Sequence, residues 1–268
     1  MTILAVSGHG MPAQTAETTG HRVSAAQAFL RASAHFGVAV NAISALADTT
    51  ELSPTFAKQQ GAWDSFVANG SVEVERVGIP YEAGTLPGYF FRPDSTLSTG
   101  KTLVAVNGSD GSLAALWAAC VSAALKRGYS VLVFDGPGQQ SQLFDHGIPF
   151  RTDWENVLTP VYDFVAGLAG IDPTHIALYG ISQGGYWVPR ALAFEHRYAA
   201  AIADPGVVDV STSWTGHLPK SLTKLLDEGK NEKFDKEMAL GMKFSPETAR
   251  TWQFRARAPE TRSSRAKS

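Results

Sequence analysis

The stretch Ala177–Tyr186, which reads ALYGISQGGY, decides the fold because the pattern of the chain changes at one serine. The apolar residues before Ser182 are typical of a buried strand, and the residues from Gly184 onward have the pattern of a helix. A strand that turns directly into a helix holds its pivot residue in a strained conformation, and small neighbours such as Gly180 avoid clashes there. We therefore expect the hydroxyl of Ser182 to project above the edge of a sheet, as a nucleophile would.

The same element predicts half of an oxyanion hole. The backbone N–H of Gln183 and the positive end of the following helix would face the negative charge that develops on a carbonyl attacked by Ser182. Because Gly-x-Ser-x-Gly also occurs by chance, its chemical meaning depends on the rest of the chain.

Length and composition indicate one large globular domain, or one domain with a smaller appendage. With 268 residues, 44% of them hydrophobic, the chain can bury a large core. The 23 basic and 25 acidic residues give a net charge of −2, which favours neither nucleic acid nor an anionic membrane as partner. We expect a small-molecule substrate. The sequence has no secretory leader pattern and no apolar run of the roughly 18 to 20 residues that span a bilayer, so the expected location is cytoplasmic.

The first third of the chain predicts helices followed by a hairpin. Helix formers with aromatic anchors fill residues 24–47 and 54–68, and we assign residues 1–70 to a helical cap segment. Apolar alternation over 72–79 and the aromatic run at 89–91 predict an antiparallel hairpin, with a bulge at Arg76 where the alternation breaks.

Beyond residue 93, buried strands alternate with helices, which predicts a mainly parallel sheet covered on both faces. Strands are expected over 103–106, 131–134, 175–178 and 199–203, and helices over 112–127, 153–169 and 184–195. The helix over 153–169 has Thr152 and Glu155 in capping-box spacing and a kink expected at Pro160. From about residue 207 only helical patterns follow, around 222–226 and 234–242. We therefore predict an α/β core over 71–257 with a helical insertion after about 207, and a polar tail over 258–268.

Two loops are expected beside Ser182, because ligands of α/β sheets bind at the carboxyl ends of the strands. In the loop 107–111, the backbone N–H of Ser109 or Asp110 could complete the oxyanion hole, and the alternative is a simple Asn-Gly turn before a helix. The loop 135–141 is a tight turn that brings backbone close to the site, and Asp135 fits a turn-fixing role better than a catalytic one.

At this point the residues carry a family resemblance. The motifs are 134–139 (Phe-Asp-Gly-Pro-Gly-Gln), Asp153-Trp154, Thr159-Pro160, 180–186, 189–191 and Phe194-Glu195, preceded by 79–82, 86–90 and Arg92-Pro93. Together they resemble the branch of the α/β-hydrolase superfamily that includes 2,6-dihydroxypseudooxynicotine hydrolase and fungal polyketide chain-shortening hydrolases. The resemblance covers roughly residues 20 to 257. Gln140 departs from it, because glycine is usual there, and a glutamine would stiffen or crowd the turn.

The resemblance implies an α/β-hydrolase fold with a helical N-terminal cap and a serine hydrolase of esters or of carbon–carbon bonds next to ketones. It also implies two further strands that carry a catalytic acid and a histidine. No strand pattern follows residue 203, so the expectation is a fold that is incomplete at its C-terminal edge, as a truncated or frame-shifted gene would give. The last strand would then expose an edge that could pair with another copy of the chain, so a homo-oligomer is one possible state.

A serine needs a base within hydrogen-bond reach to attack efficiently. Of the seven histidines, His146 and His217 follow loops near the expected site and are the candidates for the base. Asp204 ends the strand beside the nucleophile strand and is the candidate acid, the alternative being a residue that caps a turn. No motif has metal-ligand spacing and no Gly-x-Gly-x-x-Gly follows a strand, so we expect no metal and no cofactor.

Three hypotheses follow from the sequence. The first is a serine-nucleophile hydrolase acting through Ser182, whose activity depends on whether a base is present. The second is a non-catalytic or vestigial small-molecule-binding protein of the same fold. The third is acyl transfer on the same serine.

Overall fold

The computed structural model describes residues 10–209, 215, 216, 218–244 and 246, and its centre is one mixed sheet. The six strands lie in the order β1-β2-β4-β3-β5-β6. Their bounds are β1 Glu73–Tyr81, β2 Gly84–Arg92, β3 Thr102–Val106, β4 Ser130–Phe134, β5 Ile176–Ile181 and β6 Ala200–Asp204. β1 and β2 are antiparallel, β2 is antiparallel to β4, and the remaining pairs are parallel. The predicted hairpin and mainly parallel sheet are confirmed.

The predicted bulge at Arg76 is wrong. Pairing in the hairpin runs without interruption from Glu73 opposite Arg92 to Tyr81 opposite Gly84. Arg76 interrupts the apolar pattern because its guanidinium bonds Asp64 on a neighbouring helix at 2.6 Å and lies 5.7 Å from the centre of the Tyr89 ring. The polar side chain is thus satisfied on a regular strand.

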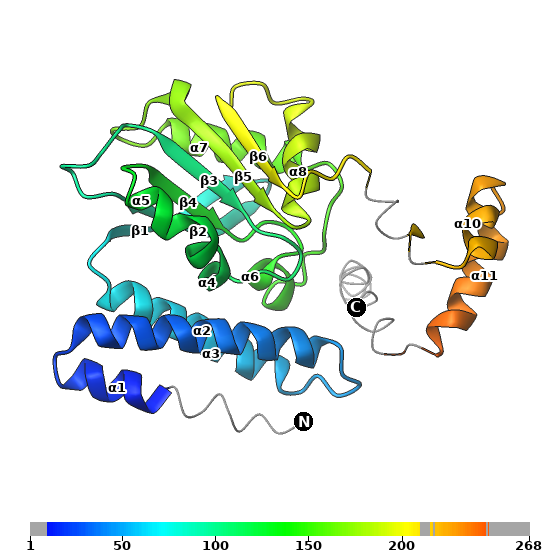
Figure 1. Ribbon diagram of the computed structural model, residues 1–268, viewed down its shortest axis with the longest axis horizontal. Coiled ribbons are helices and arrows are strands. Elements are labelled where there is room, and N and C mark those ends of the chain that lie inside the picture. Colours follow the sequence, from blue (N-terminus) through cyan, green and yellow to red (C-terminus); the bar gives the residue numbers. More distant parts are fainter. Residues whose placement is uncertain (1–9, 210–214, 217, 245, 247–268) are drawn as a thin grey trace.

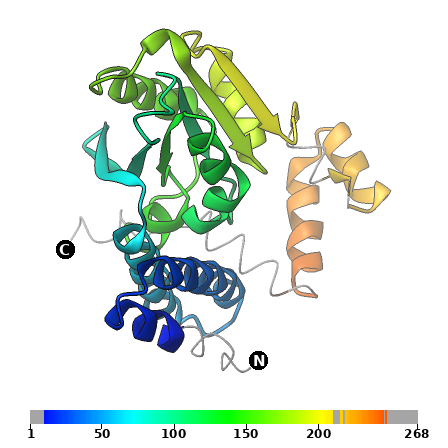
Figure 2. The same cartoon turned by 60° about the vertical axis from the view of Figure 1, so that its left-hand side comes forward.

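The two faces of the sheet bury different helices, because successive strand residues point to opposite sides. On β3, Val104 and Val106 belong to a core shared with α7 (Glu155–Ala166) and α8 (Gly184–Leu192), whereas Ala105 belongs to a second core with the N-terminal helices. Figure 2 shows these layers on either side of the strands. Covering on both faces explains why β3 and β4 read as continuous apolar runs.

The N-terminal helices form a layer beside the sheet, as Figure 1 shows. They are α1 (Gly10–Thr18), α2 (Arg22–Ser44) and α3 (Leu52–Asn69), and α2 and α3 confirm the helices predicted over 24–47 and 54–68. The indole of Trp63 packs edge-on against Tyr89 and Phe91 of β2. This contact fixes α3 on the hairpin.

The helix predicted over 112–127 is interrupted. It consists of α4 (Leu113–Leu116), a π-helical turn over Trp117–Val121 and α5 (Ser122–Leu125). Gly128 follows with a φ of +79°, the left-handed conformation that ends helices at glycine. The predicted capping box of α7 is wrong, because the N-cap is Trp154 without a side-chain bond and Glu155 bonds Arg190 instead.

The short helix α6 (Gln140–Phe144) was not predicted, and a 3-10 turn covers Pro173–His175. The helices predicted around 222–226 and 234–242 are confirmed as α10 (Lys220–Asp227) and α11 (Asn231–Met242), which lie apart from the sheet in both views (Figures 1 and 2). The predicted tail 258–268 lies outside the described residues.

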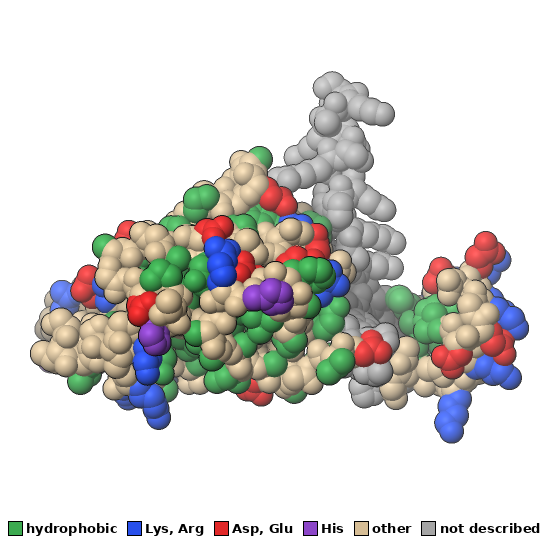
Figure 3. Space-filling model, turned by 90° about the horizontal axis from the view of Figure 1, so that it is seen from above, with side chains coloured by type: hydrophobic (Ala, Val, Ile, Leu, Met, Phe, Trp, Pro, Cys, Tyr) green, Lys and Arg blue, Asp and Glu red, His purple; other side chains and the backbone are tan. Residues whose placement is uncertain are grey.

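Charged and apolar side chains are mixed on the surface that Figure 3 shows. On the face in Figure 3, basic and acidic side chains are interspersed among apolar and uncharged ones. Each helix in the described ranges is either too short or insufficiently apolar to cross a lipid bilayer.

Candidate active site

Ser182 stands at a sharp turn between β5 and α8, as the sequence predicts. Its φ is +55°, in the left-handed region that few residues other than glycine adopt, and its side chain is exposed. Such strain persists only where the surrounding structure maintains it, and it is typical of functional sites. The serine is therefore held out from the end of the strand.

Glycines on both sides of Ser182 allow this turn. A Cβ added at Gly180 would lie 2.3 Å from the carbonyl oxygen of Gly184, and one added at Gly184 would lie 2.7 Å from the carbonyl oxygen of Val106. Both neighbours are backbone atoms, which cannot move aside cheaply. The close approach of β3, β5 and α8 at this point therefore requires the two glycines of the motif.

The loop that follows β3 packs directly against the serine. A Cβ added at Gly108 would lie 2.7 Å from the Cβ of Ser182 and 3.1 Å from its Oγ. The buried amide of Asn107 shapes the loop, because its Oδ1 accepts from Gly108 N at 3.0 Å and its Nδ2 donates to Ser112 O at 3.0 Å. Ser109 and Asp110 come next in the loop, with a bond of 3.0 Å from Ser109 Oγ to Asp110 Oδ2.

Gln183 opens the helix α8. Its backbone N–H has no hydrogen-bond partner in the described part of the chain, whereas the N–H of Ser182 donates to Asp204 O and that of Gly185 to Ser182 O. A first-turn amide of a helix is suited to bind negative charge.

Asp204 contacts the serine through its backbone rather than its side chain. Its carbonyl oxygen accepts from Ser182 N at 2.6 Å, and its Oδ2 accepts from the hydroxyl of Tyr179 at 2.8 Å. Burial, together with the bond to Asp204, raises the pKa of Tyr179 to about 12. The exposed carboxylate of the candidate acid is thus engaged by a protonated phenol.

Of the two candidate bases, the structure describes His146. His146 is exposed and lines a cavity of about 330 Å³ between α3 and the end of β4, and Ser182 is not among the residues that line it. His217 lies outside the described residues. Other histidines bond elsewhere: Nδ1 of His21 to Thr19 and Nδ1 of His175 to Asp172 at 2.7 Å.

Asp135 lies in the turn after β4 and is buried. Burial raises the pKa of its carboxyl group to about 6, against the opposing effect of two bonds from Ser141, of 2.7 Å from Oγ and 3.2 Å from N. Its contacts are those of a residue that fixes the turn. Gln140, where the resemblance expects glycine, has a positive φ of 28°, which is why glycine is common there.

Gln139 is a residue whose role the sequence did not indicate. Its side-chain Nε2 donates to Asn107 O at 2.7 Å and to Gly108 O at 3.2 Å, and its Oε1 accepts from Gly136 N at 2.7 Å. It therefore joins the turn after β4 to the loop after β3. The only signal was its place in the 134–139 motif.

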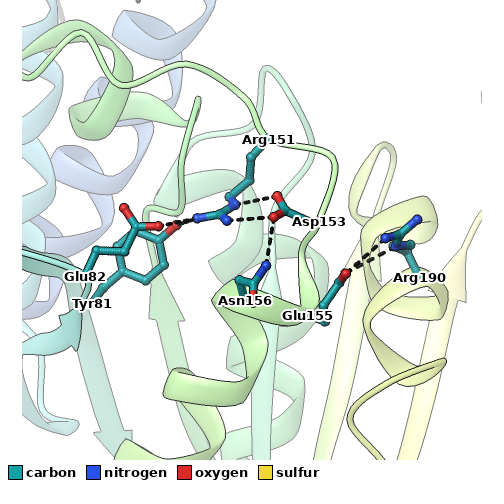
Figure 4. A network of polar contacts seen from close by, with 7 residues as sticks. All are labelled: Tyr81, Glu82, Arg151, Asp153, Glu155, Asn156 and Arg190. Carbon is teal, nitrogen blue, oxygen red and sulfur yellow. Dashed lines mark hydrogen bonds and ion pairs between the residues drawn. The ribbon is translucent and has the colours of Figure 1, made fainter.

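Ion pairs and hydrogen bonds join the turn of the hairpin to residues 151–156, and α7 to α8, as Figure 4 shows. Arg151 donates to both carboxylate oxygens of Asp153, at 2.7 and 2.8 Å, and also contacts Glu82 and the hydroxyl of Tyr81. Hydrogen bonding from Arg151 holds the pKa of Asp153 well below its usual range. Glu155 of α7 binds Arg190 of α8 at 3.0 Å, which ties the helix behind Ser182 to its neighbour.

No group of histidine, cysteine and acidic side chains able to hold a metal ion occurs in the described ranges. The arrangement in these ranges is an exposed serine with a strained backbone, beside the first turn of α8 and the loop after β3.

The sequence of this chain is similar to those of known proteins. Residues 103–266 match the Alpha/beta hydrolase family. The chain is 31% identical over 223 residues to an alpha/beta hydrolase of Aspergillus fumigatus, psoB, covering 78% of this chain and 50% of the relative. It is 32% identical over 219 residues to the hydrolase acrC of Aspergillus aculeatus, covering 75% of this chain and 51% of the relative.

Among solved structures, the chain is similar to the crystal structure of the 2,6-dihydroxy-pseudo-oxynicotine hydrolase. The TM-score is 0.69 at 21% identity, covering 81% of this chain and 60% of that one. The chain spans about half the length of the curated relatives it matches.

Proposed function

Because this chain belongs to the alpha/beta hydrolase family, we propose that it hydrolyses a small carbonyl substrate with Ser182 as the nucleophile. The observation that carries the proposal is the φ of +55° at Ser182. It supports the proposal because strained backbone residues cluster at active sites, and glycines permit the close approaches around this serine. The exposed side chain is available to a substrate.

The proposed reaction begins when Ser182 Oγ attacks the carbonyl carbon and its proton passes to a base. The carbonyl oxygen becomes an oxyanion, which would accept hydrogen bonds from Gln183 N and from the backbone N–H of Ser109 or Asp110. Collapse of the tetrahedral intermediate breaks the bond to the leaving group, which takes the proton from the base. Water then attacks the acyl-serine, giving a carboxylic acid and the free hydroxyl.

The base and the acid of this reaction are also proposals. His146 and His217 are the candidates for the base, and Asp204 is the candidate for the acid. The backbone bond from Ser182 N to Asp204 O supports a place for Asp204 beside the nucleophile. His146 lies beside the cavity that borders the turn after β4, so it would reach a substrate that extends from that cavity.

The substrate class that we propose is an ester or a carbon–carbon bond next to a ketone, as the motif resemblance implies. The names of the fungal relatives, which are hydrolases, support the reaction type. A substrate without net charge suits the nearly balanced charge of the chain, with 23 basic and 25 acidic residues.

Turnover of two substrates tests the proposal. Hydrolysis of 4-nitrophenyl butyrate reports ester cleavage, and release of acetophenone from benzoylacetone reports carbon–carbon cleavage. We expect the unmodified chain to cleave at least one of them and Ser182→Ala to lose that activity. Activity that survives in Ser182→Ala would overturn the proposal, and a butyryl ester formed with an added alcohol would instead indicate acyl transfer.

A second candidate is a binding protein of the same fold without turnover. This candidate is favoured by where three of the described histidines lie. His21 bonds Thr19, His175 bonds Asp172, and His146 lines a cavity that Ser182 does not line. A binding protein would retain its affinity for benzoylacetone in Ser182→Ala, measured by calorimetry, while showing no turnover in either form.

A further inference from the structure

The side chain of Gln139 connects the two loops that lie beside Ser182. It is almost fully buried, with 1% of its surface exposed. Its amide nitrogen donates to two successive carbonyl oxygens, Asn107 O at 2.7 Å and Gly108 O at 3.2 Å, and its amide oxygen accepts from Gly136 N at 2.7 Å. All its polar atoms are therefore directed at backbone.

The contacts of Gln139 reach the nucleophile through a single residue. Gly108, one of its two acceptors, is the residue at which an added Cβ would lie 2.7 Å from the Cβ of Ser182. A shift of the Gly108 carbonyl would move the backbone that contacts the serine, and with it the amides of Ser109 and Asp110 that follow.

The loop is also held from within. Asn107 accepts from Gly108 N and donates to Ser112 O, both at 3.0 Å, so its side chain closes the loop on itself. This bond occupies the N–H of Gly108, so the oxyanion donor that we propose in this loop is the amide of Ser109 or Asp110 rather than that of Gly108. Asn107 sets the shape of the loop, and Gln139 joins it to the turn after β4.

Only a primary amide satisfies this arrangement. The two carbonyl oxygens need donors and the N–H of Gly136 needs an acceptor, and glutamine provides both at one side-chain end. A carboxylate would place negative oxygens against two carbonyls, and a thioether would leave three buried backbone groups without partners.

We propose that Gln139 is a positioning residue that holds the 107–110 loop where its amides bind the oxyanion formed at Ser182. The inference deepens the proposed function and rests on it. Gln139 does not touch the substrate. Its loss therefore lowers the rate of attack by Ser182 and leaves substrate binding largely unchanged, because the oxyanion exists only along the reaction path.

The test measures the rate at which a fluorophosphonate labels Ser182, by intact mass, in the full chain and in Gln139→Met. Gln142→Met is the matched control, because Gln142 is also buried, with 2% of its surface exposed, and lies three residues further on. We expect labelling of Gln139→Met to be about 10- to 100-fold slower, the range for a misplaced catalytic group, and Gln142→Met to label at the unmodified rate. With a turned-over ester, the loss should fall on kcat rather than KM.

Hydrogen exchange of the peptide that contains residues 107–110 measures the order of the loop independently of the labelling reaction. Its deuterium uptake should rise in Gln139→Met and stay unchanged in Gln142→Met. Labelling of Gln139→Met at the unmodified rate would overturn the inference and leave the proposed function standing. If the unmodified chain itself is not labelled, the proposed function fails and the inference fails with it.

Gln139→Glu keeps the test decisive if Gln139→Met does not fold. The introduced carboxyl group, buried against two carbonyl oxygens, should have a pKa above the usual value of about 4.3. When protonated it donates one bond to Asn107 O, so the ratio of variant to unmodified labelling should rise as the pH falls through that pKa. A ratio near one at every pH would overturn the inference.

Discussion

The backbone N–H of Ser182 donates a 2.6 Å hydrogen bond to the carbonyl oxygen of Asp204. Because Ile181 pairs with Asp204 across β5 and β6, this bond extends the sheet by one residue into the turn. The edge strand therefore helps to fix the serine in its left-handed conformation. The carboxylate of Asp204 meanwhile binds Tyr179 at 2.8 Å, so its backbone and side chain have separate roles.

A methyl group at Gly108 should damage both the fold and the site. In Gly108→Ala the added Cβ would lie 2.7 Å from the Cβ of Ser182 and 3.1 Å from the carbonyl oxygen of Ile181. We expect the free energy of unfolding in urea to fall by about 1 to 3 kcal/mol, the usual cost of overpacking. Labelling of Ser182 should slow as well.

Gly61→Ala is the matched control for this substitution. No heavy atom lies within 4 Å of an added Cβ at Gly61, which lies within α3, so alanine there should leave stability unchanged or raise it by about 0.5 to 1 kcal/mol. Equal stability of both variants would contradict the packing that we describe around Ser182.

Stability should depend on pH through Asp135. Its carboxyl has a pKa of about 6 in the folded chain, raised by burial, against about 3.9 in an unfolded chain. Between these values the folded state binds more protons, so the free energy of unfolding falls as the pH rises. The contribution is fully present below about pH 4, and its loss is complete above about pH 6, amounting to roughly 2 to 3 kcal/mol.

Asp135→Asn isolates this effect, because asparagine retains an oxygen that accepts from Ser141 and does not titrate. Urea unfolding at pH 4.5 and pH 7.5 should show the unmodified chain losing stability relative to Asp135→Asn at the higher pH. A difference between the two chains that is the same at both pH values would contradict the buried position of this carboxyl.

We expect that a lysine at position 151 cannot reproduce the contacts of Arg151. The guanidinium binds both oxygens of Asp153 and also reaches Glu82, a geometry that a single ammonium group cannot reproduce. We expect Arg151→Lys to lower the free energy of unfolding by about 1 kcal/mol, since the network is partly exposed to solvent. Arg127→Lys, which changes an exposed residue whose guanidinium donates to Ala123 O, should be neutral. Similar values for both would show that the network in Figure 4 adds no stability.

Local sequence predicted the central elements of the fold because their signals are strong and close together. The apolar run before Ser182 and the glycines around it specify strand, turn and helix within ten residues, and the structure has β5 and α8 there. The strands β3 and β4 were equally clear, because strands buried on both faces read as continuous apolar runs.

Other features depend on contacts that no local pattern encodes. The polar residue Arg76 suggested a bulge, but the residue that satisfies it, Asp64, belongs to another element. The helix α6 has five residues, too few for a periodic pattern, and is fixed by contacts such as the edge-on packing of Phe144 on Phe56 at 5.0 Å. The bonds of Gln139 to Asn107 and Gly108 join residues more than thirty positions apart.

The rate at which a fluorophosphonate labels the purified chain, followed by intact mass and by mapping of the modified peptide, reports whether Ser182 is an activated nucleophile. Ser182→Ala is the test variant, and Ser98→Ala, which changes an exposed serine between β2 and β3, is the control. We expect rapid modification of Ser182 in the unmodified chain and in Ser98→Ala, and none in Ser182→Ala. A folded sample that remains unlabelled, or is labelled at another residue, would contradict the claim that Ser182 is an activated nucleophile.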